Sequence, residues 1–463
     1  MRFVKHLLAL GLAVSTAASA GTVSVPLYSE HGSTLSRRDA TVHIDALNQI
    51  KESAGYFTDL LVGTPPQKVR FHLDTGSSDT WVNAVNATVC TQDPPKDGPQ
   101  KKCQTPFDPK TSTTFIKDED GTFEVAYLDE TSATGDWFND TVQIGGQSVL
   151  DQSLGLALES DITEGIMGLG LTALATEGKP TILDNMVKHG AIDAAVFSVH
   201  LDDLETKSGA ILFGGIDTKK YMGKLATLPL IADPLAEDGT IRKYLVSMRS
   251  IRVDGVELDT ANVPTLLDTG STITILPKSL VARISVLLGA QIVTFGRRPS
   301  YVVDCALADN KDRRRYFEFD FGNKTIRVPP RDFIIDRIPQ ASQRMVRERV
   351  GSAADSWRKV CLLGLDSVST ALSTPKIILG DNFLRSAYVV FDATNLQLGI
   401  AQAKFKPSGS NIVGIAKGAR TIPDNEGVAE TDPETELDSS GVVLRSNAMA
   451  FVTVATCFLA VWL

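Results

Sequence analysis

The sequence lacks the signatures of the commonest hydrolase classes. Its 463 residues contain neither G-x-S-x-G nor H-E-x-x-H, so the obvious serine-hydrolase and zinc-protease motifs are missing. The six histidines do not cluster, and no pair of cysteines has C-x-x-C spacing, which argues against zinc ligation. Positive charge is in deficit, and the net charge of −9 argues against nucleic acid as a partner. We expect no metal and no cofactor.

Cysteine is scarce. One of the five, Cys457, lies in the apolar C-terminal tail, which leaves an even number in the rest of the chain. Four cysteines in a secreted protein predict two disulfides, and three pairings are arithmetically possible. We favour pairing between neighbours, Cys90–Cys103 and Cys305–Cys361, which closes one local loop in each half of the chain.

Long apolar runs are confined to the two ends. At the start, Arg2 and Lys5 precede an apolar run over 7–14 and the small residues Ala18-Ser19-Ala20. This pattern predicts a signal peptide over residues 1–20, because the apolar run is too short for the alternative, a membrane span. The chain is therefore expected to enter the secretory pathway.

The C-terminal run, residues 448–463, predicts a lipid anchor. It follows the small residues Ser439-Ser440-Gly441 and a short spacer. Small residues, spacer and terminal apolar tail together form the signal for GPI attachment, which we place at Ser440, with removal of the tail. A rival site is Ser446-Asn447-Ala448, and a retained tail anchor or a tail without function are the other interpretations.

Two further segments flank the expected catalytic body. Arg37-Arg38 is a dibasic processing site, so we expect residues 21–38 to form a propeptide. Cleavage further downstream, or an arginine pair with no processing role, remains open. Residues 406–447 are polar and turn acidic around 429–436, which is typical of a solvated linker; it would hold the body away from a membrane or cell wall.

Between these flanking segments, the sequence predicts short β-strands separated by glycine and proline, and helices only over 181–189 and 278–288.

An internal repeat predicts the architecture of this catalytic body. Leu73-Asp74-Thr75-Gly76-Ser77-Ser78 is matched about 194 residues later by Leu267-Asp268-Thr269-Gly270-Ser271-Thr272, and 164–170 is matched by 377–382. The repeat predicts an all-β, bilobal fold, with lobes over 39–235 and 236–405 and a catalytic cleft between them.

Two aspartates in matched contexts predict a catalytic dyad. Two carboxyls close enough to share one proton cannot both ionise, so one stays protonated while the other activates water. Asp74 and Asp268 are the expected pair, and which of them holds the proton is a property of the pair. The supporting residues come from the two motifs. They are Thr75, Gly76, Ser77, Thr269, Gly270 and Ser271.

The neighbours of the dyad have distinct expected roles. Gly76 and Gly270 allow a tight turn that points backbone N–H groups at the carboxylates. The hydroxyls of Ser77 and Ser271 would hydrogen-bond the outer carboxylate oxygens, and the alternative is that they only cap turns.

Residues 56 to about 403 resemble the pepsin family of bilobal aspartic proteases. The segments that carry the resemblance are Tyr56-Phe57, Gly63-Thr64-Pro65-Pro66-Gln67, the two motifs above with Trp81-Val82, Gly209 to Gly215, and Ile378 to Arg385. The resemblance implies an endopeptidase acting on proteins or peptides, working as a monomer. It also implies a flap whose Tyr127 hydrogen-bonds Trp81, although Leu128 stands where the family usually has glycine.

Within that family, the chain is most similar to the yapsins, which are fungal surface proteases that prefer basic sites. Asp129 stands where several fungal relatives carry an aspartate that accepts a basic substrate side chain, and Glu130 follows it. The loop between Cys90 and Cys103 has mixed charge and adds no acidic surface. A broad-specificity digestive protease is the alternative, and a non-catalytic binding protein is a more distant one.

Three N-x-T sequons predict a glycosylated surface. They lie at Asn86, Asn139 and Asn323. The basic run 311–315 and the charged stretch 337–358 are interpreted as an exposed insertion of a secreted lobe and not as a nucleic-acid site.

Overall fold

The computed structural model describes residues 21–30, 55–92, 103–233, 236–295, 298–309, 315–335, 338, 340–367 and 377–431. The expected signal peptide, the dibasic site at Arg37-Arg38, the attachment site at Ser440 and the apolar tail lie outside the described residues. No helix of the described part is long and apolar enough to cross a membrane.

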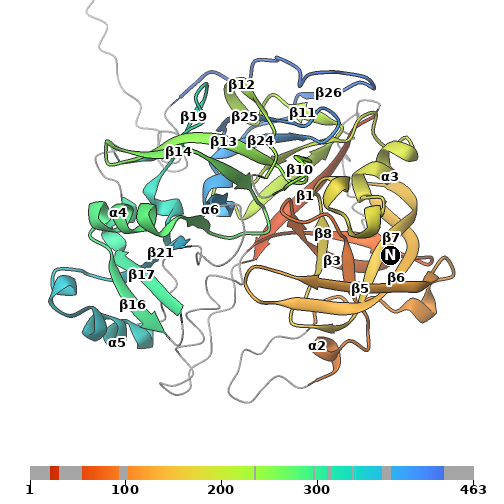
Figure 1. Cartoon of the computed structure of the whole chain (residues 1–463), viewed down its shortest axis with the longest axis horizontal. Helices are drawn as coiled ribbons and strands as arrows, with labels where there is room; N and C mark the ends of the chain where they lie inside the picture. Colours follow the sequence, from red (N-terminus) through yellow and green to blue (C-terminus); the bar gives the residue numbers. More distant parts are fainter. Residues whose placement is uncertain are drawn as a thin grey trace, which may run out of the picture.

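The fold is all-β and bilobal (Figure 1). One lobe, drawn in orange and yellow, carries β2 (Gly55–Val62), β3 (Gln67–Asp74), β4 (Trp81–Asn83), β5 (Ile116–Ala126), β6 (Ser132–Ile144), β7 (Gln147–Ser160) and β8 (Gly165–Gly168). Its helices are α2 (Thr88–Thr91) and α3 (Ile182–Lys188).

The second lobe, drawn in green and teal, contains two sheets. The larger consists of β13 (Leu245–Val253), β14 (Val256–Leu267), β15 (Thr274–Leu276), β18 (Phe317–Asp320), β19 (Thr325–Val328), β22 (Leu365–Ser367) and β23 (Ile377–Leu379). The smaller consists of β16 (Gln291–Phe295), β17 (Arg298–Asp304), β20 (Ile334–Ile335) and β21 (Val360–Leu363), and the helices are α4 (Lys278–Leu288), α5 (Gln340–Val350) and α6 (Asp381–Leu384).

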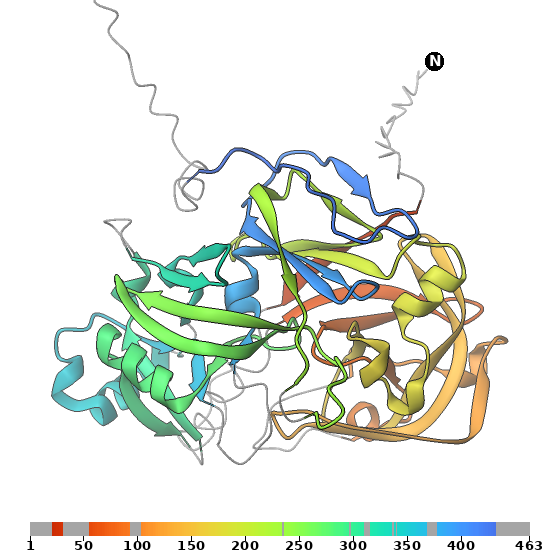
Figure 2. The same ribbon diagram turned by 45° about the horizontal axis from the view of Figure 1, so that its top comes forward.

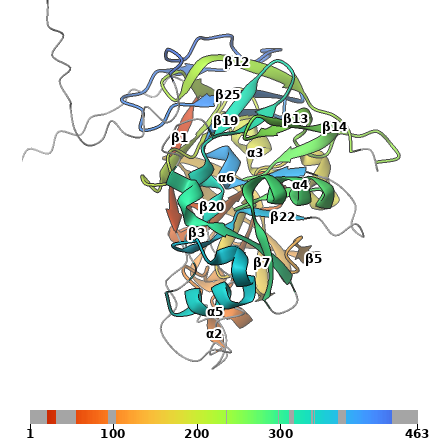
Figure 3. The same cartoon turned by 90° about the vertical axis from the view of Figure 1, so that its left-hand side faces the viewer.

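Strands from distant parts of the chain join the lobes. β1 (Val23–Glu30), β9 (Val196–His200), β10 (Ser208–Phe213), β12 (Tyr221–Pro229), β24 (Ala387–Asp392) and β25 (Gln397–Ala403) extend the sheet of the first lobe, and β11 (Gly215–Asp217) pairs separately with β26 (Ile412–Gly414). In Figure 3 β12 and β25 lie at one end of the molecule and α5 lies at the other.

Both expected helices form. Thr181 caps α3: its hydroxyl accepts the backbone N–H of Asp184, whose carboxylate accepts the N–H of Thr181, a reciprocal capping box. α4 starts after Pro277 and ends at Gly289, whose φ of 66° is readily adopted only by glycine. The amphipathic helix α5 was missed, because its residues were interpreted only as a charged insertion.

The internal repeat is visible in the strand pairing. β3 runs parallel to β8, with Asp74 opposite Gly168, and β14 runs parallel to β23, with Leu267 opposite Leu379. The backbone N–H of Asp268 then donates to the carbonyl of Leu379 at 3.0 Å. Each catalytic motif therefore follows a strand held beside the second repeated segment of its own half.

Residues of the expected propeptide form part of the large sheet of the first lobe. β1 lies between β10 and β2, and its side chains Val23, Val25 and Leu27 are buried in the main core. Cleavage after Arg38 would cut the covalent link to this strand and leave its hydrogen bonds in place. The removal of residues 21–38 stays a prediction.

The expected start of the solvated linker at residue 406 is wrong. Residues 406–431, which we call the C-terminal segment, cross over the central strands as the blue trace in Figures 1 and 2. Ile415 and Ile422 are buried beside Tyr221, and the hydroxyl of Tyr221 donates to the carbonyl of Asn425 at 2.8 Å. Apolar side chains spaced through a polar sequence hold this segment against the body.

Both disulfides have the expected pairing, Cys90–Cys103 and Cys305–Cys361. Of the three sequons, Asn86 and Asn323 are exposed, whereas Asn139 is half-buried and donates its side-chain amide to Asp151 at 3.0 Å. Glycosylation of these sites stays a prediction.

Candidate active site

The two aspartates occupy equivalent positions at the junction of the lobes. Asp74 is the last residue of β3, and Asp268 directly follows β14; only 5% and 9% of them are exposed. The backbone N–H of Gly76 donates to Oδ1 of Asp74 at 2.8 Å, and that of Gly270 donates to Oδ1 of Asp268 at the same distance. The expected N–H groups therefore do point at the carboxylates.

The same glycines show that the two carboxylates lie together. A Cβ atom on Gly76 would lie 2.8 Å from both carboxylate oxygens of Asp268. A Cβ atom on Gly270 would lie 2.5 Å from Oδ1 of Asp74 and 3.1 Å from Oδ1 of Asp268. Each glycine thus makes room for the aspartate of the opposite motif, a role that its own turn did not reveal.

The threonines of the motifs join the lobes beneath the dyad. The backbone N–H of Thr75 donates to Oγ1 of Thr269 at 3.1 Å, and the backbone N–H of Thr269 donates to Oγ1 of Thr75 at 3.1 Å. The two hydroxyls donate in turn to the carbonyls of Leu267 and Leu73. These four buried hydrogen bonds fix the two turns relative to each other.

The two serines differ. The hydroxyl of Ser77 donates to Oδ2 of Asp74, as expected. The expectation for Ser271 is wrong, because its hydroxyl donates to the carbonyl of Ile273 at 2.8 Å. A serine hydroxyl can bond to the carbonyl two residues further on and so close a local turn. Ser271 makes this local bond and does not donate to the carboxylate of Asp268.

The dyad is built to hold a proton. Burial raises the pKa of Asp268 well above its ordinary value, and the negative charge of Asp74 raises it further. The hydrogen bond from Gly270 and the charge of Lys243 act in the opposite direction, but they are weaker. A pair of carboxyls that shares one proton and accepts N–H and O–H donors is suited to general acid–base work on water.

A hairpin formed by β5 and β6 places the tyrosine near the dyad. Nε1 of Trp81, which is fully buried, donates to the hydroxyl of Tyr127 at 2.8 Å, which is the expected contact. Burial and the charge of Asp74 raise the pKa of Tyr127 above its ordinary value, so its hydroxyl stays protonated. Leu128, at the turn of the hairpin, is 62% exposed.

Asp129 lies in the same turn. Its Oδ1 atom accepts the backbone N–H of Thr131 at 3.0 Å and the hydroxyl of Thr131 at 2.7 Å. The turn continues through Glu130, which adopts a φ of 73°. The hairpin turn thus carries the carboxylate of Asp129 two residues beyond Tyr127.

A buried charged cluster lies behind Asp268, and the sequence pattern did not assign it a role. The guanidinium of Arg385 donates to Oδ1 of Asp332 at 2.6 Å. The side chain of Asp381 is buried, and its Oδ1 atom has no hydrogen-bond partner. Burial raises the pKa of Asp381 well above its ordinary value, and Asp268 contributes to the increase. Its position directly after Leu379-Gly380, beside the second motif, was the available signal.

Within the described ranges, no group of three or more His, Cys, Asp or Glu side chains is placed to hold a metal ion.

Comparisons with known proteins agree with this geometry. Residues 55–403 match the family described as eukaryotic aspartyl protease. The chain is 32% identical over 420 residues to the probable aspartic-type endopeptidase opsB of Aspergillus oryzae, covering 88% of this chain and 79% of the relative. It is 35% identical over 376 residues to the acid protease of Saccharomycopsis fibuligera, covering 79% and 85%. It is 33% identical over 387 residues to the aspartic proteinase yapsin-3 of Saccharomyces cerevisiae, covering 78% and 68%. The chain therefore belongs to the eukaryotic aspartyl protease family and is a pepsin-like aspartic endopeptidase.

Proposed function

We propose that this endopeptidase is secreted, is anchored at the cell surface through a GPI anchor, and cleaves proteins or peptides at Lys or Arg. The observation that carries the specificity is the carboxylate of Asp129 in the turn of the β5–β6 hairpin, two residues beyond Tyr127. A charge-assisted hydrogen bond from a substrate ammonium or guanidinium to this carboxylate would favour basic residues.

The reaction itself follows from the shared proton. The ionised carboxylate of the dyad removes a proton from a bound water as its oxygen bonds to the scissile carbonyl carbon. The protonated carboxyl gives its proton to the carbonyl oxygen, so the tetrahedral intermediate is neutral. Collapse of the intermediate returns that proton to the dyad, while the leaving nitrogen takes the proton removed from water and the C–N bond breaks.

The secretory route and the anchor are supported by sequence features at both ends. A signal peptide over residues 1–20 and an attachment site at Ser440 would deliver the enzyme to the outer face of the plasma membrane or cell wall. The similarity to yapsin-3 agrees with this assignment. Release of the intact enzyme from cells by a phosphatidylinositol-specific phospholipase would test it, and Asp74→Asn should be released equally. An enzyme that stays cell-bound after this treatment would contradict the anchor.

The specificity is tested with matched peptides that differ only in Lys, Arg, Leu or Phe on the carbonyl side of the scissile bond. Wild type is compared with Asp129→Asn, which keeps the acceptor for Thr131 and loses the charge. We expect the ratio of kcat/KM for Lys over Leu peptides to fall by about tenfold or more, as loss of a charged hydrogen bond predicts. Asp355→Asn, at an exposed position, is the control and should leave the ratio unchanged.

Other outcomes would change the assignment. Faster cleavage of Leu and Phe peptides by wild type, unaffected by Asp129→Asn, would indicate a broad-specificity digestive protease. A correctly processed wild type that cleaves no peptide would contradict the enzyme and favour a binding protein of the same fold.

A further inference from the structure

A groove outside the active site lies between β12, the turn that joins β18 to β19, and the end of the C-terminal segment. Its volume is about 770 Å³, which is within the range of small-ligand sites. The register of β12 against β25 shifts between Met222 and Ala226, and the groove lies along this irregular stretch. The lining residues are Gly223, Lys224, Leu225, Ala226, Thr227, Asn323, Lys324, Glu426 and Glu430.

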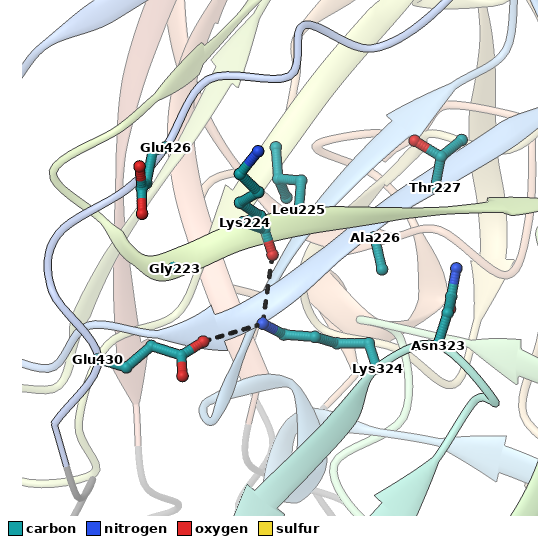
Figure 4. A pocket seen from close by; sticks show the side chains of 9 residues that line it. All are labelled: Gly223, Lys224, Leu225, Ala226, Thr227, Asn323, Lys324, Glu426 and Glu430. Carbon is teal, nitrogen blue, oxygen red and sulfur yellow. Dashed lines mark hydrogen bonds and ion pairs between the residues drawn. The ribbon is translucent and has the colours of Figure 1, made fainter.

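The groove is polar and open at its edge. Lys324 crosses it, with Nζ 3.2 Å from the carbonyl of Lys224 and 3.5 Å from the carboxylate of Glu430 (Figure 4). The carboxylates of Glu426 and Glu430 are exposed, and in Figure 4 they lie on opposite sides of the β12 ribbon near Gly223. Ammonium, carboxylate and backbone groups around a shallow floor match the hydroxyl and acetamido groups of a sugar.

Asn323 is the lining residue that connects this groove to a ligand. It begins the sequon Asn323-Lys324-Thr325, it is exposed, and its side chain points toward β12 (Figure 4). The other exposed sequon residue, Asn86, does not line this groove. A group attached to the Asn323 amide would therefore start inside the groove.

We propose that Asn323 carries an N-linked glycan whose inner sugars occupy this groove and hold the end of the C-terminal segment on the body. The inference rests on the secretory route proposed above. In the attachment step, Nδ2 of Asn323 bonds to the anomeric carbon of an oligosaccharide linked to a lipid diphosphate. The bond from that carbon to the diphosphate breaks, the lipid diphosphate leaves, and the amide loses one proton.

Such a glycan would help to hold the end of the C-terminal segment against the body. The end of the segment is held by backbone hydrogen bonds, from Gly427 to the carbonyl of Gly223 at 2.7 Å and from Gly223 to the carbonyl of Val428 at 2.9 Å. Beyond them, the carboxylate of Glu430, which is 71% exposed, pairs with Lys324, and the hydroxyl of Thr431 donates to Sδ of Met222 at 3.3 Å. An exposed ion pair contributes little to stability, so a further contact would reduce the opening of this end. A glycan in the groove would supply that contact.

The test uses the secreted, full-length glycoprotein and a glutamyl endopeptidase, because Glu426 and Glu430 both line the groove. Thr325→Val removes the sequon without changing Asn323, and Thr325→Ser retains it. Asn86→Gln is the matched control, because it removes a glycan site elsewhere. The rate of cutting at Glu426 and Glu430 is measured by mass spectrometry of the fragments, and peptide hydrolysis by each variant confirms that it is folded.

We expect cutting at these two sites to be about tenfold faster in Thr325→Val, because proteolysis of a locally opened segment follows the population of its open form. Thr325→Ser and Asn86→Gln should behave as wild type. Equal rates in wild type and Thr325→Val would overturn the proposal. So would an unmodified Asn323 in secreted protein that is glycosylated at Asn86, an outcome that leaves the secretory route intact. A chain that is not secreted at all would instead contradict the proposed function.

Discussion

Thr75 and Thr269, 194 residues apart, exchange backbone and side-chain hydrogen bonds in a symmetric pattern. Each hydroxyl accepts the backbone N–H of the other threonine and donates to a carbonyl of the opposite motif. Since both residues are buried, no water replaces these partners. The position of the two catalytic aspartates therefore depends on contacts between the lobes and not on either turn alone.

Removing one hydroxyl should leave two buried groups without partners. In Thr269→Val the N–H of Thr75 loses its acceptor, and the carbonyl of Leu73 loses its donor. We expect the free energy of unfolding to fall by about 2–4 kcal/mol and kcat to fall with it. Denaturant unfolding and steady-state kinetics measure both. Thr269→Ser keeps the hydroxyl and serves as control; equal losses in the two variants would contradict the role of the hydrogen bonds.

Gly270→Ala should damage catalysis more than stability. Its Cβ atom would lie 2.5 Å from Oδ1 of Asp74, so the carboxylate must move. A displacement of about 1 Å in a reacting group is enough to reduce kcat by about 100-fold. The control is Gly289→Ala, which has open space but a φ of 66°, and should lower stability while leaving kcat unchanged. A Gly270→Ala enzyme with wild-type kcat would show that the carboxylates tolerate the side chain.

Activity should fall as pH rises. Because burial and Asp74 raise the pKa of Asp268, the shared proton is present below that pKa and is lost as pH rises through it. On the alkaline side, kcat/KM should fall by about tenfold per pH unit. Lys243 lowers the pKa of Asp268, so Lys243→Gln should move this limb to higher pH. The pH profiles of both proteins test this; a limb that moves to lower pH in Lys243→Gln would contradict it. Asp74→Asn removes one carboxyl of the dyad, and its kcat should be about 1,000-fold lower than that of wild type, so it serves as the inactive control.

Asp381 should make the fold sensitive to neutral pH. Its pKa is raised by burial in the folded state, so its contribution to stability is present below the unfolded pKa of about 3.9 and is lost as pH rises through the folded pKa. Each unit of increase corresponds to about 1.4 kcal/mol once the group is ionised. Asp381→Asn should therefore gain stability relative to wild type between pH 4 and pH 7, measured by thermal unfolding. A difference between the two proteins that is constant with pH would contradict this, and Asp355→Asn is the exposed control.

The C-terminal segment should contribute to stability. Ile415 is 3% exposed and packs in the cluster around Tyr221 and Tyr388. Ile415→Ala should lower the free energy of unfolding by about 2–4 kcal/mol, as expected for a buried isoleucine. Lys417→Ala, at an exposed position of the same segment, should have no measurable effect. Denaturant unfolding of the two variants tests whether the segment packs on the body. If it were only tethered, neither substitution would change the free energy of unfolding.

Local sequence was sufficient for much of the site. The repeated motifs around Asp74 and Asp268 predicted the dyad and the two similar halves, because a strand followed by a tight turn is encoded by adjacent residues. The contact between Trp81 and Tyr127 was available through the family resemblance. The neighbouring disulfides followed from cysteine spacing in two local loops.

What the sequence did not reveal depends on contacts between residues far apart in the chain. The exchange between Thr75 and Thr269, the space that Gly270 leaves for Asp74, and the burial of Asp381 exist only when the lobes meet. The hydroxyl of Ser271 donates to the carbonyl of Ile273, a difference that the similarity of its motif to that of Ser77 concealed.

The amino-acid sequence by itself determined which residues carry the chemistry and the strand-rich, two-fold repeated architecture, because both are encoded in short apolar and turn patterns. Only the tertiary structure decided how the two turns are held together and where the body ends. Ile415 and Ile422 show the reason, because they are isolated apolar residues in a polar stretch that the sequence pattern assigns to a linker. Their burial beside Tyr221 depends on a surface that exists only in the folded body.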